Sequence, residues 1–305
     1  MKALFLWLSR NRWLGRQLTR TWLLRRAVLR FVPGERAADA LDACAGVAAD
    51  GRASLVTYLG ENVTDRQSAL GVTEHYLGVL RKIQARELPS EISVKVTQLG
   101  YDIDPNLAAA QVRELAMAAK PSGRYVWIDI EGSAYVDGTV ELYRNLQPDH
   151  PNLGLALQAY LHRTADDVRA LLPLEPAIRL VKGAYREPAS IAYQDKRSVD
   201  ANYAALAALL YSGLRGRGRV ALGSHDVVLI EQAVGIAGAC GVTREQVEVQ
   251  MLYGIRAADQ ARLASTGLDV RTLVSYGEAW YAWYMRRLAE RPANAFLALR
   301  QIVGI

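Results

Sequence analysis

The sequence predicts a closed (β/α)8 barrel preceded by a basic N-terminal arm. Eight apolar runs of strand length alternate with stretches of helical length, which is the pattern of a parallel sheet. The chain has 305 residues and is 51% hydrophobic, a size and composition that suit one barrel of this kind. No Gly-x-Gly-x-x-Gly follows any of the apolar runs, which disfavours an open doubly wound sheet.

Residues 1–34 form the arm, which holds eight basic residues and no acidic residue. The whole chain has 37 basic and 31 acidic residues, so the rest of the chain has 29 basic residues against all 31 acidic ones. The excess of positive charge therefore belongs to the arm. An apolar run at residues 3–8 is too short to span a bilayer, which needs about 20 residues. Pro33 and Gly34 end the arm.

Three tryptophans of the arm, Trp7, Trp13 and Trp22, alternate with arginines and leucines. This pattern favours a helix that lies on an anionic membrane surface. Two different interpretations stay open. One is a helix packed on the barrel with its arginines in water, and the second is a targeting presequence, which is also rich in arginine and poor in acidic residues.

The barrel is expected to occupy residues 35–305 as one domain, because no linker or low-complexity segment interrupts it. A first helix is predicted from about Glu35 to Ala49. The predicted strands are Ser54–Leu59, Ile92–Thr97, Tyr125–Ile130, Gly154–Ala159, Ile178–Lys182, Arg219–Gly223, Val247–Leu252 and Val270–Val274. The helices between and after them are predicted near residues 65–87, 105–120, 137–147, 164–172, 199–215, 226–240, 256–265 and 278–291.

Two cations, Arg179 and Lys182, stand within the apolar run that begins at Ile178. Burying an unpartnered charge is costly, so either both side chains reach solvent or an anionic or electron-rich group lies at the end of this strand. Gly183 follows and allows a close approach to the backbone. Because the active site of such a barrel lies at the C-terminal ends of its strands, polar residues at seven of the eight predicted ends favour a ligand.

Several classes of site are disfavoured by what the sequence lacks. Its two cysteines and four histidines show no disulfide framework and no metal-ligand spacing. There is no P-loop, no Gly-x-Ser-x-Gly elbow and no obvious carboxylate pair for glycoside hydrolysis. A strand arginine below an electron-rich ring suits a flavin, and the adjacent Arg286 and Arg287 suit a carboxylate. Taken singly, His225 reads as a structural histidine and Asp226 as a helix cap.

These residues, in their order and spacing, resemble the proline dehydrogenase family over about residues 50–300. The segments that carry the resemblance are 179–185, Asp129 with Glu131, 158–160, 224–226 and 286–290. The resemblance implies a distorted (βα)8 barrel that binds FAD without a covalent bond and oxidises L-proline to Δ1-pyrroline-5-carboxylate. Electrons would pass to a membrane quinone. The short chain is similar to the monofunctional bacterial form, so we expect a cytoplasmic protein with no nucleic-acid partner, peripheral on the inner face of the cell membrane if the arm binds lipid.

The resemblance also implies roles for individual residues. Asp129 matches the catalytic aspartate, and Arg179 matches the arginine beside the flavin N5 atom. Lys95, Arg286 and Arg287 match the residues around the substrate carboxylate, with Glu290 paired to that cluster. The positions that match flavin contacts are Ile130, Gln158, Arg179, Lys182, Gly183, Ala184, Ser224, His225, Gln250 and Leu252.

Two positions depart from the family's pattern. Leu273 and Trp283 stand where the family has tyrosines that line the substrate pocket. We expect proline turnover weaker than is usual for the family, or a preference for a modified cyclic amino acid such as N-methylproline or hydroxyproline. The alternative is that a nearby phenol, Tyr276 or Tyr284, restores the pocket. Two further hypotheses are a flavin-binding barrel that has lost turnover and a phosphate-handling barrel enzyme without flavin.

Overall fold

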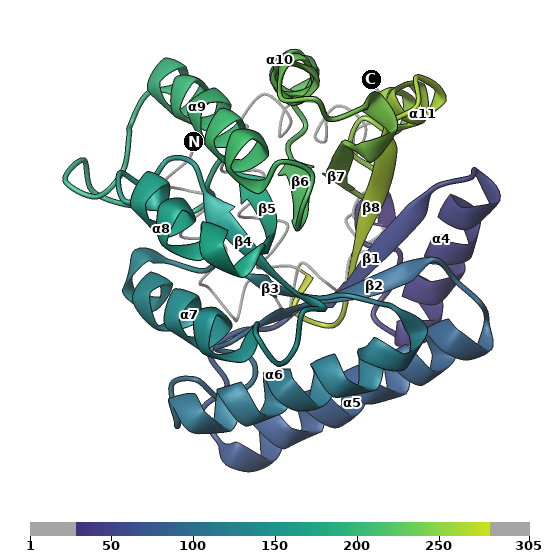
Figure 1. The fold of residues 1–305 in the computed structure, drawn as a ribbon. Helices are drawn as coiled ribbons and strands as arrows, with labels where there is room; N and C mark the ends of the chain where they lie inside the picture. Colours follow the sequence, from purple (N-terminus) through teal and green to yellow (C-terminus); the bar gives the residue numbers. More distant parts are fainter. Residues whose placement is uncertain (1–28, 281–305) are drawn as a thin grey trace, which may run out of the picture.

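The structure, a computed structural model, describes residues 29–280, which form a closed barrel of eight parallel strands (Figure 1). The strands follow chain order around the barrel, and β8 closes it by pairing with β1 from Ala53↔Arg271 to Tyr58↔Tyr276. The predicted fold is therefore confirmed. The strands are β1 (Ala53–Tyr58), β2 (Ser90–Lys95), β3 (Val126–Asp129), β4 (Leu153–Gln158), β5 (Ala177–Val181), β6 (Arg219–Gly223), β7 (Glu248–Leu252) and β8 (Asp269–Tyr276).

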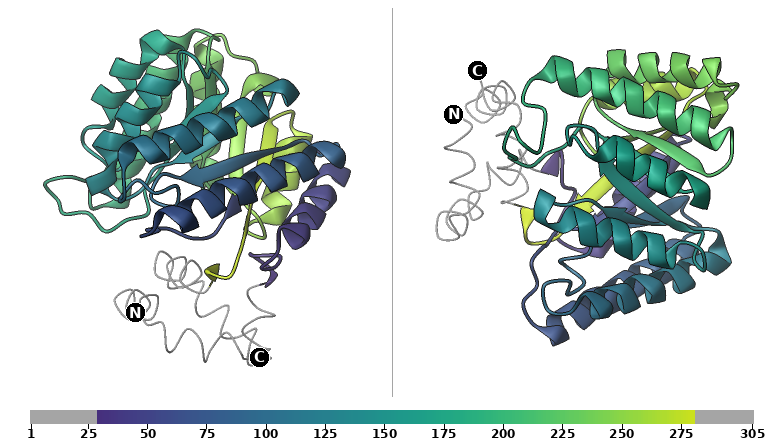
Figure 2. Two further views of the ribbon diagram at one scale, coloured as in Figure 1. Left: turned by 90° about the horizontal axis from the view of Figure 1, so that it is seen from below. Right: turned by 60° about the vertical axis from the view of Figure 1, so that its left-hand side comes forward.

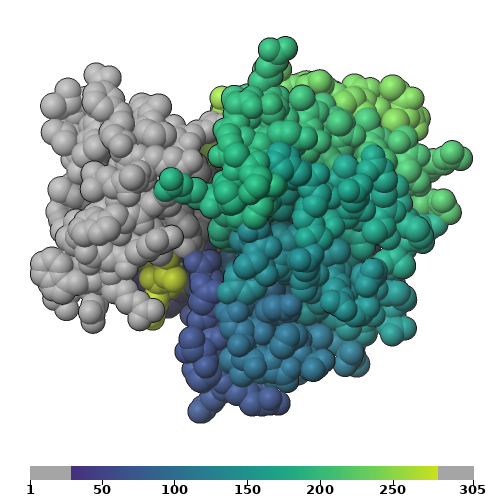
Figure 3. Space-filling view, turned by 90° about the vertical axis from the view of Figure 1, so that its left-hand side faces the viewer, coloured from purple at the N-terminus to yellow at the C-terminus, as the bar shows by residue number. Residues whose placement is uncertain are grey.

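Helices cover the outside of the strands (Figures 1 and 2). The α-helices are α4 (Ala37–Ala49), α5 (Arg66–Ala85), α6 (Pro105–Ala119), α7 (Ser133–Leu146), α8 (Thr164–Leu171), α9 (Lys196–Leu214), α10 (Val227–Ala239) and α11 (Ala257–Ser265). The short 3-10 helices are η1 (Lys120–Ser122), η2 (Leu172–Leu174) and η3 (Arg244–Gln246). In the space-filling view of Figure 3, the teal segments from the middle of the chain make up much of the visible surface of the described residues. None of the helices within residues 29–280 is long and apolar enough to cross a membrane.

Most predicted boundaries agree with the structure to within a few residues. Strand β2 is the clearest shift, because it ends at Lys95 rather than Thr97 and the chain turns directly after it. Helix α7 begins at Ser133, four residues before the predicted start. Helix α4 packs on the outer faces of β1 and β8, so a helix that precedes the first strand closes the outer layer there. The helix predicted at residues 278–291 lies largely outside the described residues.

Alternate strand residues separate two apolar regions. One set faces outward and packs beneath the helices, as Val56, Ile92 and Val94 do in the largest buried cluster. The other set fills the barrel interior, where Leu55, Trp127, Ala177 and Ala221 form a small cluster. The polar residues that face inward are therefore surrounded by strands rather than by water.

Charged side chains fill the N-terminal end of the barrel. Arg219 donates through Nη1 and Nη2 to Glu91, at 2.8 and 3.0 Å, and through Nε to Glu248 at 2.6 Å. Arg271 lies 3.4 Å from each of the same two carboxylates. Both glutamates are buried, and this pairing provides the partners that a buried charge requires.

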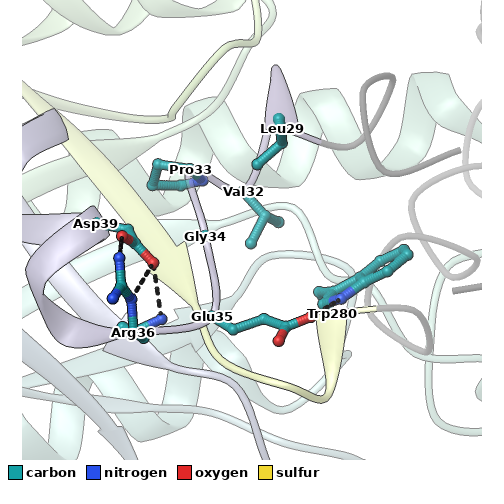
Figure 4. A pocket seen from close by; sticks show the side chains of 8 residues that line it. All are labelled: Leu29, Val32, Pro33, Gly34, Glu35, Arg36, Asp39 and Trp280. Carbon is teal, nitrogen blue, oxygen red and sulfur yellow. Dashed lines mark hydrogen bonds and ion pairs between the residues drawn. The ribbon is translucent and has the colours of Figure 1, made fainter. Parts of the chain in front are cut away.

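The segment before α4 returns to the C-terminal end of the barrel. Gly277 N donates to Gly34 O at 3.3 Å, and Trp280 Nε1 donates to Glu35 Oε1 at 3.0 Å. A pocket of about 400 Å³ lies between this segment and Trp280 (Figure 4). The segment also contacts the loop after β7, where the Arg30 carbonyl lies so close to Gly254 that a side chain there would collide with it. The arm thus joins the fold beside the ends of β7 and β8.

Candidate active site

The C-terminal ends of β2, β3 and β5 bring four polar side chains together inside the barrel. Arg179 and Asp129 form a direct ion pair, and the buried Ser93 hydroxyl lies 2.9 Å from both Arg179 Nη2 and Asp129 Oδ1. Lys95 Nζ lies 3.9 Å from Asp129 Oδ2. The Arg179 side chain is only 4% exposed, so its charge is held by these partners and not by water.

The small residues of β4 leave room for this cluster. Ala156 is the register partner of Arg179, and Gly154 is the partner of Trp127. A Cβ atom on Gly154 would lie 2.5 Å from the Trp127 ring, so only glycine fits beside that indole. Arg179 can therefore reach across β4 to Asp129, and its guanidinium carbon lies 5.2 Å from the Trp127 ring centroid.

Gln250 supports Arg179 from β7. Its Oε1 accepts from Arg179 Nη1 at 3.0 Å, and its Nε2 donates to Glu248 Oε1 at 2.6 Å. Sequence reasoning identified Gln250 but missed Ser93, Trp127 and Glu248. A signal for them exists, because each stands two residues before an identified residue on the same strand, and side chains two apart share one face.

Beyond β3, the buried Glu131 contacts the end of β2. Its carboxylate accepts from Thr97 N at 3.2 Å and from Thr97 Oγ1 at 2.7 Å. Burial raises the pKa of Glu131, and the hydrogen bonds from Thr97 oppose that rise. Gln158 Nε2 donates to the Glu131 carbonyl at 3.3 Å, and Gln158 Oε1 is buried without a hydrogen-bond partner within residues 29–280. The neighbouring Ile130 is buried in a small apolar cluster.

A second charged cluster lies at the ends of β5 and β6. Lys182 Nζ is 2.5 Å from Asp200 Oδ1 and 3.1 Å from Asp226 Oδ2, and Lys196 contacts the same two carboxylates. Burial opposes ionisation of Asp226, but the hydrogen bonds from Lys196 and Lys182 outweigh it and lower its pKa to about 2. Beside this cluster, Ser224 Oγ accepts from Asp226 N at 3.1 Å.

The loop after β5 approaches β4 closely. Gly183 has a φ of +119°, and a Cβ atom there would collide with the Tyr160 ring, so this position requires glycine. Ala184 follows it in the same loop. At the end of β7, Leu252 N lies 3.5 Å from His225 Nε2. The positions identified on β4 to β7 thus lie around one end of the barrel.

Leu273 and Tyr276 face opposite sides of the barrel wall. Leu273 packs against the interior cluster that contains Trp127. Tyr276 is fully buried in the outer cluster, and its Oη lies 2.6 Å from His75 Nε2. Tyr276 therefore does not supply the phenol that is missing at position 273. Tyr284, Trp283, Arg286, Arg287 and Glu290 lie outside the described residues.

The cluster of Lys95, Arg179 and Asp129 carries two positive groups and one negative group. Its surplus positive charge, held in a water-poor barrel, suits an anionic or electron-rich ligand at the strand ends. No group of three or more His, Cys, Asp or Glu side chains with metal-binding geometry occurs in the part of the chain that the structure describes.

Comparison with known proteins gives matches over most of the chain. A family profile described as proline dehydrogenase matches residues 40–297. Proline dehydrogenase 1 of Bacillus subtilis (strain 168) is 35% identical over 304 residues, which cover 99% of each chain. A proline dehydrogenase of Deinococcus radiodurans is 34% identical over 271 residues, 87% of this chain and 86% of that protein.

Solved structures with the same fold belong to larger proteins. Proline utilization A from Bdellovibrio bacteriovorus, inactivated by N-propargylglycine, matches with a TM-score of 0.80 and 23% identity over 87% of this chain. Proline utilization A from Corynebacterium freiburgense matches with a TM-score of 0.75 and 21% identity over 99% of this chain. The matches cover 32% and 34% of those proteins, so this chain corresponds to about a third of each, and the likeness concerns the fold.

Proposed function

The chain belongs to the proline dehydrogenase family, and from this premise we propose that it oxidises L-proline to Δ1-pyrroline-5-carboxylate with FAD as cofactor. A membrane quinone is the proposed electron acceptor. The observation that carries the proposal is the ion pair of Arg179 with Asp129 beside Lys95, at the strand ends where a barrel enzyme holds its active site.

The residues present fit a flavin. The buried Gln158 Oε1 has no donor among residues 29–280 and can accept a hydrogen bond, and Gly183 lets a ligand approach the backbone after β5. Arg179 uses three of its five N–H donors on Asp129, Ser93 and Gln250 and makes no other hydrogen bond within residues 29–280. FAD, when bound, supplies a two-electron acceptor.

The chain's own contribution is binding, orientation and electrostatics. We assign the substrate carboxylate to Lys95, Arg286 and Arg287, with Glu290 holding the arginine pair. Asp129 orients Arg179 and balances part of the charge of Lys95. The other proposed flavin contacts are Ile130, Lys182, Ala184, Ser224, His225, Gln250 and Leu252. Hydrogen-bond donors that are already fixed in place, such as those of Arg179, lower the activation barrier because they need no rearrangement during the reaction.

A second candidate function is oxidation of a modified cyclic amino acid, such as N-methylproline or hydroxyproline. The inward-facing Leu273 favours it, because an aliphatic side chain replaces a phenol in the proposed pocket and Tyr276 points away from that pocket. Trp283 is the second proposed pocket residue that departs from the family's pattern.

We also propose that residues 1–34 bring the protein to the inner face of the cell membrane, as a peripheral protein of the cytoplasm. Eight basic residues and three tryptophans support binding to anionic lipid. The described end of the arm lies beside β7 and β8 at the C-terminal end of the barrel, so the arm joins the fold near the proposed active site.

An anaerobic absorbance experiment tests the function directly. The purified protein is expected to show the bands of oxidised flavin, and L-proline is expected to bleach them. A bound flavin that L-proline and its cyclic analogues all leave oxidised would indicate a binding protein without turnover. Protein that takes up no flavin would reject the proposal as a whole.

A further inference from the structure

Ser93 connects the two charged groups of the proposed site. Its hydroxyl oxygen lies 2.9 Å from Arg179 Nη2 and 2.9 Å from Asp129 Oδ1, and its side chain is fully buried on β2. The Arg179 guanidinium can only donate hydrogen bonds, so the Ser93 oxygen must accept from it. The single Ser93 proton is then left for the Asp129 carboxylate, since the other acceptor, the Trp127 carbonyl, is 3.5 Å away.

Gln250 fixes the opposite side of the guanidinium in the same manner. Its amide could face either way, but Glu248 accepts from its Nε2 at 2.6 Å. That contact leaves the Gln250 Oε1 atom for Arg179 Nη1 at 3.0 Å. Glu248 is itself bonded to Arg219 at 2.6 Å, so the amide orientation is set by the charged layer at the N-terminal end of the barrel.

Asp129, Ser93 and Gln250 together determine which donors of Arg179 remain. Both Nη2 protons and one Nη1 proton are occupied by protein acceptors. No side chain within residues 29–280 accepts a hydrogen bond from the Nε proton or from the second Nη1 proton. Rotation of the guanidinium would break at least two buried hydrogen bonds, so its orientation is held before any ligand arrives.

We propose that Ser93 and the pair of Gln250 with Glu248 are positioning residues, which set the Arg179 guanidinium for electron transfer from substrate to flavin. This inference rests on the proposed function. It concerns the rate of flavin reduction and neither flavin binding nor the binding of a substrate carboxylate, because Ser93 lies on the side of Arg179 that its protein partners occupy.

The experiment compares Ser93→Ala, Ser93→Cys and Ser54→Ala with wild type. Ser54 is the matched control, because it is a buried serine bonded to Ser90 Oγ at 2.7 Å on the outer face of β1, away from Arg179. Alanine leaves the hydroxyl position empty, whereas cysteine fills it with a larger sulfur that bonds only weakly, so a fall in rate in both variants points to the lost hydrogen bond and not to lost packing. Each protein is mixed anaerobically with a series of L-proline concentrations, and flavin content, limiting rate of bleaching and half-saturating concentration are recorded.

Both Ser93 variants are expected to keep wild-type flavin content and a half-saturating concentration within about twofold, while the limiting rate falls about tenfold. Gln250→Leu is expected to lower the limiting rate as well, and Ser54→Ala is expected to match wild type. Wild-type bleaching rates in both Ser93 variants would overturn the inference, and so would an equal loss in Ser54→Ala. A wild-type protein that proline does not bleach would reject the proposed function itself, which is a separate result.

Discussion

Arg179 and Asp129 pair directly although they come from β5 and β3, which are not neighbours in the barrel. The strand between them, β4, presents Ala156 at that level, and the small side chain lets the guanidinium pass. The pair is thus a contact across the barrel interior. It depends on a carboxylate on β3, a small residue on β4 and an arginine on β5.

Removing the carboxylate of this pair is expected to destabilise the fold. Asp129→Ala would leave Arg179 as a buried cation whose remaining hydrogen-bond partners in the described part of the chain, Ser93 and Gln250, are uncharged. We expect a loss of about 3 kcal/mol in the free energy of unfolding, at the low end for a buried pair because the Asp129 side chain is 19% exposed. Urea denaturation of the flavin-free protein measures this loss.

Asp129→Asn is the matched control for that measurement. Its amide oxygen still accepts from Arg179 and Ser93 but carries no charge, so we expect a smaller loss, of about 2 kcal/mol. Equal losses in the two variants would show that hydrogen-bond acceptance by Asp129 contributes nothing and would contradict the account of the pair.

Glu131 is expected to make stability depend on pH. Burial raises its pKa above the usual 4.5, so the unfolded chain ionises this carboxyl at lower pH than the folded protein does. The stability that the protonated Glu131 carboxyl contributes is therefore fully present below pH 4.5, and it is lost as pH rises through the pKa of the folded state. Wild type should therefore lose stability relative to Glu131→Gln as pH increases from about 4 to about 7, as measured by urea denaturation at each pH.

The substituted amide can still bond Thr97 N and Oγ1 but does not titrate, which makes Glu131→Gln the proper reference. A difference in unfolding free energy between the two proteins that stays constant across this range would contradict the raised pKa.

The sequence was sufficient to predict the barrel and the side chains at the C-terminal ends of its strands, because strand and helix periodicity and the strand-end rule depend on local residues. The alternation of residues along β8 also indicates which face of the barrel wall the Tyr276 side chain lies on. An inward Leu273 places the residue three positions later on the outer face. The contacts of Arg30 and Gly34 with the loops after β7 and β8 were not predictable in this way, since they join segments far apart in the sequence and leave no periodic signal.

The arm is expected to control membrane binding without affecting the active site. Val32, Gly34 and Glu35 contact the barrel, so the test protein should begin at Leu29 and keep these three residues. This truncation removes seven of the eight basic residues of the arm. This protein should no longer cosediment with anionic vesicles but should still reduce a soluble dye with proline as donor. Neutral vesicles are the control, and equal sedimentation of full-length and truncated protein with anionic vesicles would reject the role of the arm.

The adjacent arginines beyond the described residues are expected to bind the substrate carboxylate. Lysine cannot reproduce the bidentate contact of a guanidinium, so Arg286→Lys and Arg287→Lys should each raise KM for proline at least about tenfold. Flavin content should stay near wild type. Arg262→Lys, at an exposed arginine of α11, is the control, and an unchanged KM in both test variants would remove the pair from the substrate site.

Leu273 is expected to alter substrate preference. A phenol at this position would offer a hydrogen bond to a polar ring, whereas Leu273 adds its aliphatic side chain to the cluster around Trp127. The hydroxyl of Tyr276 lies 2.6 Å from His75 on the other side of the wall and cannot replace it. A polar group left unpaired costs about 1–3 kcal/mol, and about 1.4 kcal/mol corresponds to a tenfold change in rate.

We therefore expect N-methylproline to be oxidised with a higher kcat/KM than 4-hydroxyproline, because an added methyl group gains contact with Leu273 and an added hydroxyl finds no partner there. A panel of L-proline, N-methylproline, 4-hydroxyproline and pipecolate measures this preference in wild type and in the double variant Leu273→Tyr with Trp283→Tyr. The double variant should shift the preference toward L-proline by about tenfold. If wild type already favours L-proline over every analogue and the two tyrosines change nothing, positions 273 and 283 do not determine the substrate, and the pocket must be completed by side chains elsewhere.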